Sequence, residues 1–178
     1  MSKRQGGRAK SANDFYPTPA SAVLPLIPFL RPGLRYFEPC AGAGDLIKHL
    51  AAHKIHCVGA CDIEPRGDFI ARQSCLELTS NDLPPYAGVA FITNPPHTHE
   101  WLAPIIEHLR KLRPTWLLLP LDWFATRQAA PHLIHCSHIV AIGRMKIFTG
   151  SESTGFDNFA WARFQRDHPG DTVFHGRI

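Results

Sequence analysis

The sequence predicts an α/β fold, in which buried strands and covering helices alternate around one sheet. Short runs of apolar, mostly β-branched or aromatic residues, for example residues 89–92, are typical of strands buried on both faces. Residues 100–112 instead repeat their apolar side chains at helical spacing, with charged side chains opposite. A glycine-containing turn at 40–44 joins a strand-like segment to a helix-like one. These observations indicate a mostly parallel sheet with helices on both faces.

The other elements follow in chain order from the same two periodicities. A largely apolar helical stretch at 20–30 is interrupted by Pro25 and Pro28, and Thr18 before Pro19 is well placed to cap it. Strands are expected at 35–39, 55–61, 74–78, 89–92, 116–121, 137–142 and 159–164, and further helices at 45–53, 100–112 and 128–134. Residues 167–178 carry no strong pattern.

Length and composition favour a single globular domain. The chain has 178 residues, of which 44% are hydrophobic and 19% charged, enough for a sizeable core. Residues 1–13 are polar and basic, so we expect a flexible arm, either a solvated tail or a contact to nucleic-acid phosphates. The net charge of +4 fits a nucleic-acid partner but also many proteins with none.

The cysteines predict a reduced, cytoplasmic protein without a metal. There are five, without the spacing of a disulfide framework. Cys57 and Cys61 have His53 and His56 nearby, but a strand separates their faces and no second Cys/His pair has tetrahedral-site spacing. No apolar segment approaches the roughly 18–20 residues that span a bilayer. We therefore expect no membrane partner.

A rigid polar loop ends the strand at 89–92. It reads Asn94-Pro95-Pro96-His97, and its prolines fix φ and supply no N–H. The side chain of Asn94 and the carbonyl oxygens of Pro95 and Pro96 form a cluster of acceptors beside the ring of His97. Such a cluster suits a planar amino group, which needs acceptors for two protons and a face on which to stack.

The turn at 40–44 is predicted to approach a ligand. It follows a strand that ends near Glu38, and Gly42 and Gly44 let the backbone pass where any Cβ would collide. Asp45 stands at the helix start, where its charge would repel a pyrophosphate. The segment therefore disfavours a dinucleotide and favours a cofactor without phosphate, whose amino group a carboxylate can hold.

A carboxylate also follows the strand at 55–61. Asp62 can accept hydrogen bonds from both hydroxyls of a ribose at this position. Glu64 is the alternative ligand.

Three motifs in this order resemble the S-adenosylmethionine-dependent amino-methyltransferases: residues 14–19, 37–45 and 94–97. The whole chain, including 157–161, is most similar to compact phage-type DNA adenine-N6 methyltransferases. The resemblance implies a Rossmann-like, seven-stranded, mostly parallel sheet with an antiparallel terminal hairpin, formed by residues 14–178. It also implies S-adenosyl-L-methionine as the cofactor.

The resemblance further implies which residues contact the cofactor. They are Tyr16, Thr18, Glu38, Cys40, Gly42, Gly44, Asp45, Asp62, Ile63, Asp82 and Asn94. Tyr16 and Thr18 would lie near the methionine end; without the resemblance they are a helix cap and an aromatic anchor. Asp82 would accept from the adenine amino group, or alternatively be a turn residue before Pro84-Pro85.

The implied reaction is methyl transfer to the exocyclic N6 amino group of adenine in DNA. Asn94, Pro95, Pro96 and His97 are the expected catalytic residues, and His97 would stack on a base extruded from the duplex. We expect no separate target-recognition domain and therefore short or relaxed sequence specificity. The same motif serves adenine N6 or guanine N2 in RNA and the glutamine side chain of proteins. A catalytically silent nucleic-acid-binding module is a further alternative.

Expected nucleic-acid contacts lie near the ends of the later strands. Trp123 follows the strand at 116–121, where its ring packs either on the target base or in the core. Arg144 and Lys146, with the nearby Arg127, are either a basic rim for a phosphate backbone or part of a solvated loop. The recognition sequence and the oligomeric state stay open.

Overall fold

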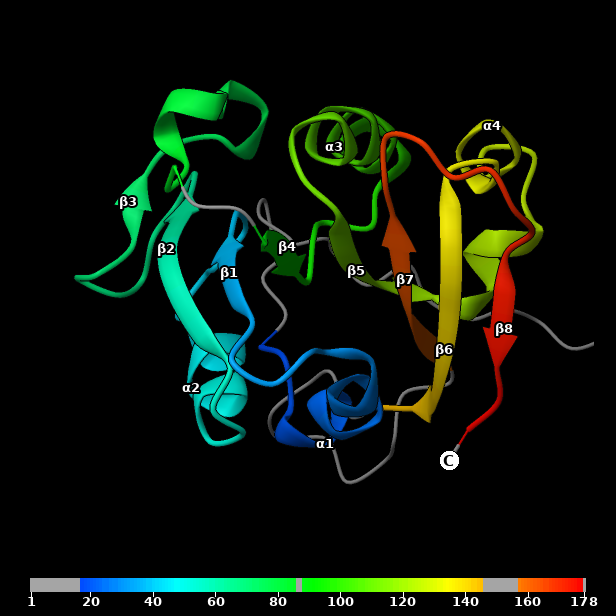
Figure 1. Cartoon of the computed structure of the whole chain (residues 1–178), viewed down its shortest axis with the longest axis horizontal. Coiled ribbons are helices and arrows are strands. Elements are labelled where there is room, and N and C mark those ends of the chain that lie inside the picture. Colours follow the sequence, from blue (N-terminus) through cyan, green and yellow to red (C-terminus); the bar gives the residue numbers. More distant parts are fainter. Residues whose placement is uncertain (1–16, 86–87, 146–156, 178) are drawn as a thin grey trace, which may run out of the picture.

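One eight-stranded sheet forms the centre of the molecule, in the order β3-β2-β1-β4-β5-β7-β6-β8 (Figure 1). The computed structural model describes residues 17–85, 88–145 and 157–177. The strands are β1 (Arg35–Glu38), β2 (His56–Asp62), β3 (Ala71–Arg72), β4 (Val89–Thr93), β5 (Thr115–Pro120), β6 (Cys136–Arg144), β7 (Asn158–Phe164) and β8 (Val173–His175). Strands β1 to β5 are parallel, and β7 runs antiparallel between β5 and β6. The predicted α/β class and the antiparallel terminal hairpin are confirmed.

The strands differ from the prediction in two places, and their number is eight instead of seven. Residues 74–78 do not form a strand, because the Ser74 side chain accepts from the backbone N–H of Leu76 and starts the 3₁₀ helix η2 (Cys75–Glu77). The third strand is instead the two-residue β3. The second difference is β8, which pairs parallel with β6 and was not expected. Both β3 and β8 are too short for a periodic pattern to show.

Helices cover both faces of the sheet. Helices α1 (Ala20–Val23) and α2 (Asp45–Ala51) lie on one face, and α3 (His99–Leu112) and α4 (Ala130–Leu133) lie on the other (Figure 1). The remaining 3₁₀ helices are η1 (Leu24–Phe29), η3 (Ser80–Asp82) and η4 (Leu121–Ala125). No helix within the described part of the chain is long and apolar enough to cross a membrane.

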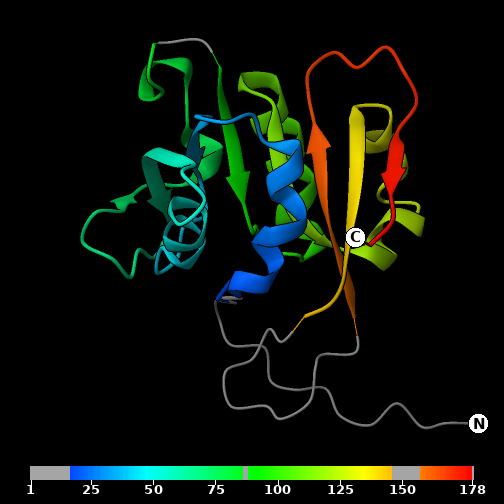
Figure 2. The same cartoon turned by 60° about the horizontal axis from the view of Figure 1, so that its bottom comes forward.

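The segment 20–29 is only briefly α-helical. It continues from α1 into η1, where Pro25 and Pro28 supply no N–H for an α-helical hydrogen bond. The predicted Thr18 cap is wrong, since Pro19 is the N-cap and no side chain caps the helix. In Figure 2 this blue segment lies over the middle of the sheet. It is fixed there by Trp161 of β7, whose indole N–H donates to the carbonyl of Ala22 at 2.8 Å.

Alternating residues of each strand pack against the two helical layers. Tyr36, Ile92 and Trp116 belong to the cluster that also holds α1 and η1. Their chain neighbours, such as Phe91 and Leu117, pack instead in the clusters that include α3. Strands β4 and β5 are therefore buried on both faces, as their continuous apolar sequences predicted. Because β1, β2, β4 and β5 are parallel, their carboxyl ends meet at one edge of the sheet.

Candidate cofactor and amino-group site

A cavity of about 570 Å³ opens at the carboxyl ends of β1, β2 and β4. This volume is in the range of small-ligand sites, roughly 300–1,000 Å³. The predicted cofactor residues that line it are Thr18, Glu38, Cys40, Gly42, Asp45, Asp62, Ile63 and Asn94. The fold thus brings together segments that are far apart in the sequence. Tyr16 lies outside the described residues.

The glycine turn holds the backbone close to β2. Gly42 and Gly44 both have positive φ, 53° and 80°, which L side chains rarely adopt. A Cβ on Gly44 would also lie 2.7 Å from the ring of Phe69. The backbone N–H of Ala41 donates to the carbonyl of Cys61 at 3.0 Å. The turn therefore needs glycine for its shape, and of the two glycines only Gly42 is among the described residues that line the cavity.

Asp62 organises the cavity wall. One of its carboxylate oxygens accepts from the backbone N–H of Gly42 and the other from that of Glu64, each at 2.8 Å. A carboxylate oxygen has more than one lone-pair site, so both can accept a further donor from a ligand. The arrangement fixes the carboxylate at the end of β2 and fits the predicted contact to ribose hydroxyls.

Glu38 is a buried carboxyl group with an orphaned oxygen. The residue is 2% exposed, and its Oε2 has no hydrogen-bond partner among the described residues. Burial, and then the negative charges of Asp62 and Asp45, raise the pKa of Glu38 well above its ordinary value. An unsatisfied buried acceptor costs roughly 1–3 kcal/mol. A ligand with an ammonium group or another donor would satisfy it, so this wall fits the amino-acid end of S-adenosylmethionine.

Asn94 lies at the other side of the cavity, directly after the buried strand β4. Its side-chain Nδ2 donates to the hydroxyl oxygen of Thr18 at 3.2 Å. Thr18 is 5% exposed, so the pair is held in the interior. The hydroxyl predicted to cap α1 therefore orients the Asn94 amide instead. Pro96 also lines the cavity, and Pro95 before it is buried.

His97 connects the same loop to the sheet. Its Nε2 lies 2.9 Å from the carbonyl oxygen of Leu118 in β5, so this nitrogen carries the proton and donates. The ring centroid lies 5.6 Å from that of Phe159, with an interplanar angle of 48°. The half-buried ring is thus held between β5 and β7, beside Asn94.

Asp82 lies away from the cavity. Its carboxylate accepts from the side-chain hydroxyl and the backbone N–H of Thr79, both at 2.7 Å, and these bonds lower its pKa. Asp82 is thus a capping residue of η3, which agrees with its alternative as a turn residue. In its place Ser74, Cys75 and Leu76 line the cavity.

The sequence did not predict Ser74, Cys75 and Leu76 as cavity residues, because a strand was expected at 74–78. It also missed Trp101 and Ile105, which line the cavity from the first turns of α3. Their spacing of four residues on one helical face was the available signal.

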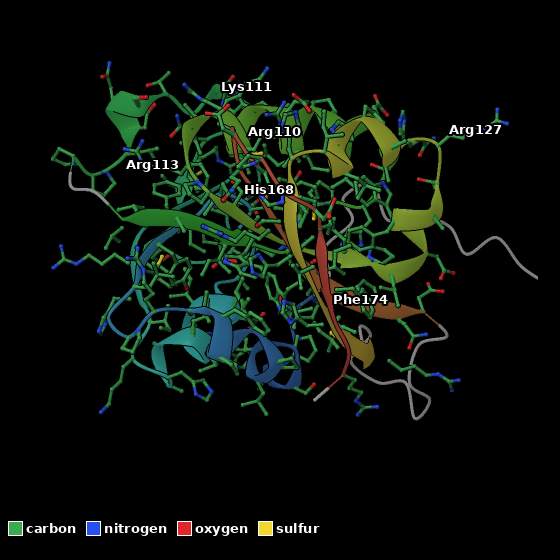
Figure 3. The ribbon with its side chains drawn as sticks, turned by 45° about the vertical axis from the view of Figure 1, so that its right-hand side comes forward. Arg110, Lys111, Arg113, Arg127, His168 and Phe174 are labelled. Carbon is green, nitrogen blue, oxygen red and sulfur yellow. The ribbon has the colours of Figure 1, made fainter. Side chains whose placement is uncertain are left out.

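The predicted nucleic-acid residues separate into different environments. Trp123 packs against His132 and Phe164, with centroid distances of 6.2 and 6.4 Å, so its ring belongs largely to the core. Arg127 is exposed and projects away from the body of the molecule (Figure 3). Arg144 is exposed at the end of β6, and Lys146 lies outside the described residues. Neither arginine lines the cofactor cavity.

No metal centre accompanies this site in residues 17–85, 88–145 and 157–177. These residues contain no group of three or more His, Cys, Asp or Glu side chains that could hold an ion. All five cysteines are free thiols.

Known proteins resemble the chain in fold only. No family model and no curated protein matches it. A proposed class I S-adenosylmethionine-dependent methyltransferase from Listeria monocytogenes has a TM-score of 0.53 and 10% identity, over 88% of this chain and 62% of that one. A modification subunit of a proposed type I restriction enzyme from Vibrio vulnificus has a TM-score of 0.54 and 12% identity, over 94% and 48%. The chain spans less than two thirds of either protein. Its fold is that of the Rossmann-like methyltransferases.

Proposed function

We propose that this protein transfers a methyl group from S-adenosylmethionine to the exocyclic N6 amino group of adenine in DNA. One observation carries the proposal: Asn94, held by Thr18, lines the same cavity as Glu38 and Asp62. A group that can accept hydrogen bonds from an amino nitrogen therefore adjoins the proposed site of an amino-acid and ribose ligand. The cofactor, when bound, supplies an electrophilic methyl group on a sulfonium.

The residues of the loop would prepare the amino group for this transfer. An adenine amino nitrogen is a poor nucleophile because its lone pair is conjugated with the ring. Acceptance of its two protons by the side-chain oxygen of Asn94 and the backbone carbonyl of Pro95 draws the nitrogen toward a tetrahedral state. Both acceptors are rigid, since Pro95 and Pro96 fix the loop and Thr18 holds the amide. His97 would offer its ring to the extruded base.

Two features support DNA as the substrate. The motifs are most similar to those of phage-type DNA adenine-N6 methyltransferases, and one structural neighbour is named as a modification subunit of a proposed type I restriction enzyme. The exposed Arg127 and Arg144 near the ends of η4 and β6 are the proposed contacts to the phosphate backbone.

Nucleoside mass analysis tests the proposal directly. The protein is incubated with methyl-labelled S-adenosylmethionine and one substrate at a time: duplex DNA, single-stranded DNA, structured RNA or a protein extract. We expect labelled N6-methyladenine from DNA, lost in Asn94→Ala and retained in Asn81→Ala, an exposed asparagine outside the cavity. Label in RNA alone would show that RNA is the substrate and not DNA. Label only in the glutamine side chains of a protein extract would show that the substrate is a protein. Cofactor binding without any transfer would establish the silent module.

A further inference from the structure

A second cavity, of about 590 Å³, lies at the opposite edge of the sheet. It is found where β4 and β5 begin and β7 ends, and it shares no lining residue with the cofactor cavity. Its walls combine aromatic rings and arginines: Phe29, Trp116, His138, Arg31, Arg113 and Arg163. None of the lining residues that the structure describes is acidic. The proposed methyl transfer makes no use of this cavity.

Strand register builds the floor of this cavity. Arg163 of β7 lies opposite Trp116 of β5 on one side and His138 of β6 on the other. Residues directly opposite in neighbouring strands project from the same face of a sheet. The Trp116 and His138 rings have centroids 6.1 Å apart, and the Phe29 ring is 6.2 Å from each. The floor is therefore formed by the half-buried rings of Phe29 and His138 over the buried Trp116, which is 4% exposed, with the guanidinium of Arg163 in the middle row. The His138 ring also stacks on that of His175 at 5.4 Å.

The positive charge of the cavity is not balanced from within. Arg163 is half-buried, and its burial together with the nearby charge of Arg31 lowers its pKa. No ion pair joins Arg31, Arg113 or Arg163 to a carboxylate within the described ranges. Arg113, which projects at the end of α3 (Figure 3), donates only to the carbonyl of Leu112 among the hydrogen bonds found there. Grouped guanidinium groups of this kind favour a bound anion, above all a phosphate.

We propose that this cavity binds a nucleotide, with its base on the aromatic floor and its phosphate on the arginines. A simple phosphate would leave most of the volume and the aromatic surface unused. Five residues of β4, about 17 Å at 3.3 Å each, separate this edge from the loop of Asn94. The ligand is therefore distinct from a base held at Asn94, and the inference does not depend on the proposed reaction.

Photolabelling locates the site. The full-length protein is irradiated with 8-azido-AMP, and the modified peptides are mapped by mass spectrometry. We expect label in peptides that contain Phe29, Trp116 or His138. Label confined to peptides of the cofactor cavity, or no label, would overturn the inference.

Binding measurements test the chemistry. By calorimetry, AMP should bind more tightly than either adenosine or inorganic phosphate. Arg163→Gln and Arg31→Gln should each weaken AMP binding about tenfold, the value of one charge-assisted hydrogen bond. The matched control is Arg177→Gln, because Arg177 lies over Gly143 in the other half of β6. Arg31 is exposed, so its variant retains the test if Arg163→Gln folds poorly. Equal binding by the parent and Arg31→Gln, or binding of oligonucleotides but not AMP, would refute a nucleotide site.

Discussion

The side-chain nitrogen of Asn94 donates to the hydroxyl oxygen of Thr18 at 3.2 Å, although 76 residues separate the two in the chain. The contact joins the segment before α1 to the loop after β4. It has a chemical consequence, because a donating Nδ2 leaves the amide oxygen Oδ1 as the acceptor on the other side of the same group. The side-chain amide of Asn94 is thus oriented in part by a residue outside its own loop.

Replacing Thr18 by valine keeps the shape of the side chain and removes its hydroxyl. We expect kcat for methyl transfer to fall by about tenfold, since one hydrogen bond contributes about 0.5–1.5 kcal/mol. Labelled-methyl transfer under saturating cofactor measures the effect. Thr18→Ser, which keeps the hydroxyl, is the control and should retain activity. A Thr18→Val enzyme with parental kcat would show that Asn94 is oriented by other contacts.

Glu38→Gln should change how the stability of the ligand-free protein depends on pH. The folded-state pKa of Glu38 is raised, so the folded protein holds this proton more tightly than the unfolded chain does. That contribution is fully present below the ordinary glutamate pKa of 4.5 and is lost as pH rises toward the raised value. The variant should therefore gain stability relative to the parent at pH 8 but not at pH 4.5.

Thermal unfolding at the two pH values measures this difference. Glu64→Gln, whose carboxylate is exposed, is the control. Equal shifts of Tm at both pH values would contradict a raised pKa of the buried Glu38. Glu38→Gln should also bind S-adenosylmethionine more weakly, because an amide cannot ionise to the carboxylate that is proposed to face the ammonium group of the cofactor.

Replacing His97 by phenylalanine keeps an aromatic ring in the loop and removes the hydrogen bond to the carbonyl of Leu118. We expect kcat for methyl transfer to fall about tenfold, because the ring loses a contact that holds it against β5 and one hydrogen bond contributes about 0.5–1.5 kcal/mol. Labelled-methyl transfer under saturating cofactor measures the effect. His97→Ala, which also removes the ring, should lose more activity, and equal losses in the two variants would count against stacking of the ring on a base.

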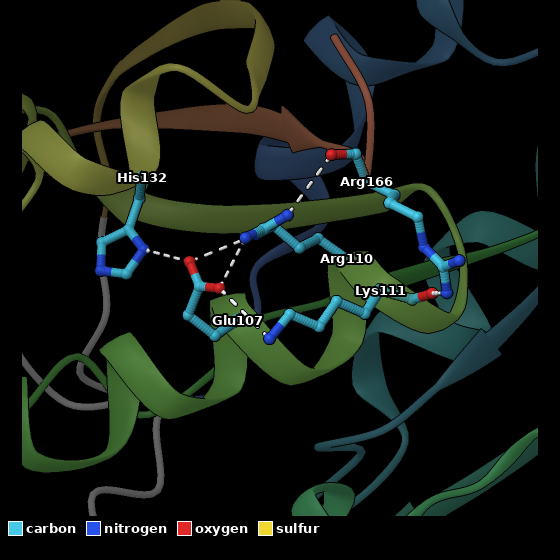
Figure 4. A network of polar contacts seen from close by, with 5 residues as sticks. All are labelled: Glu107, Arg110, Lys111, His132 and Arg166. Atoms are coloured by element: carbon cyan, nitrogen blue, oxygen red, sulfur yellow. Dashed lines mark hydrogen bonds and ion pairs between the residues drawn. The ribbon is translucent and has the colours of Figure 1, made fainter.

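Glu107→Gln should destabilise the fold at neutral pH. Glu107 accepts from Arg110 at 2.6 Å and from His132 at 2.9 Å, and Arg110 also donates to the carbonyl of Arg166 (Figure 4). Arg110 is 8% exposed, so removing the carboxylate of Glu107 would leave a buried positive charge without its partner. We expect a loss of about 1–3 kcal/mol in the free energy of unfolding, measured by urea denaturation.

The pH dependence of this loss is a further check. Partial burial opposes ionisation of Glu107, yet the hydrogen bonds from Arg110 and His132 lower its pKa below 4.5. Its contribution is therefore present above that pH and lost as pH falls through the lowered value. The difference between Glu107→Gln and the parent should shrink in acid. Glu77→Gln serves as the control, since Glu77 lies outside the network.

The sequence predicted those parts of the fold that depend on local pattern. Strands β4 and β5 were found because residues buried on both faces form continuous apolar runs. The turn with Gly42 and Gly44 was found because its backbone requires glycine. Most of the predicted cofactor residues line one cavity, because many of them lie at or just after the carboxyl ends of predicted strands.

The errors lie where tertiary contacts outweigh local preference. A threonine before a proline is a good helix cap, but the hydroxyl of Thr18 bonds to Asn94 instead. Asp82 was expected to accept from the adenine amino group or to be a turn residue before Pro84-Pro85, and the contact of its carboxylate to Thr79 was not foreseen; its contact to a cofactor stays a prediction. Strand β8 exists because the edge of β6 accepts it, and that edge cannot be read from residues 173–175 alone.

The two hydrogen bonds that the Asp62 carboxylate accepts from backbone N–H groups should affect the rate at which a ligand binds. Since Gly42 and Glu64 are already fastened to this carboxylate, the wall that would receive a ribose is ordered before any ligand arrives. A ligand then meets a preformed surface and need not wait for a loop to fold around it. Association at this wall should therefore proceed in a single phase whose rate rises linearly with ligand concentration.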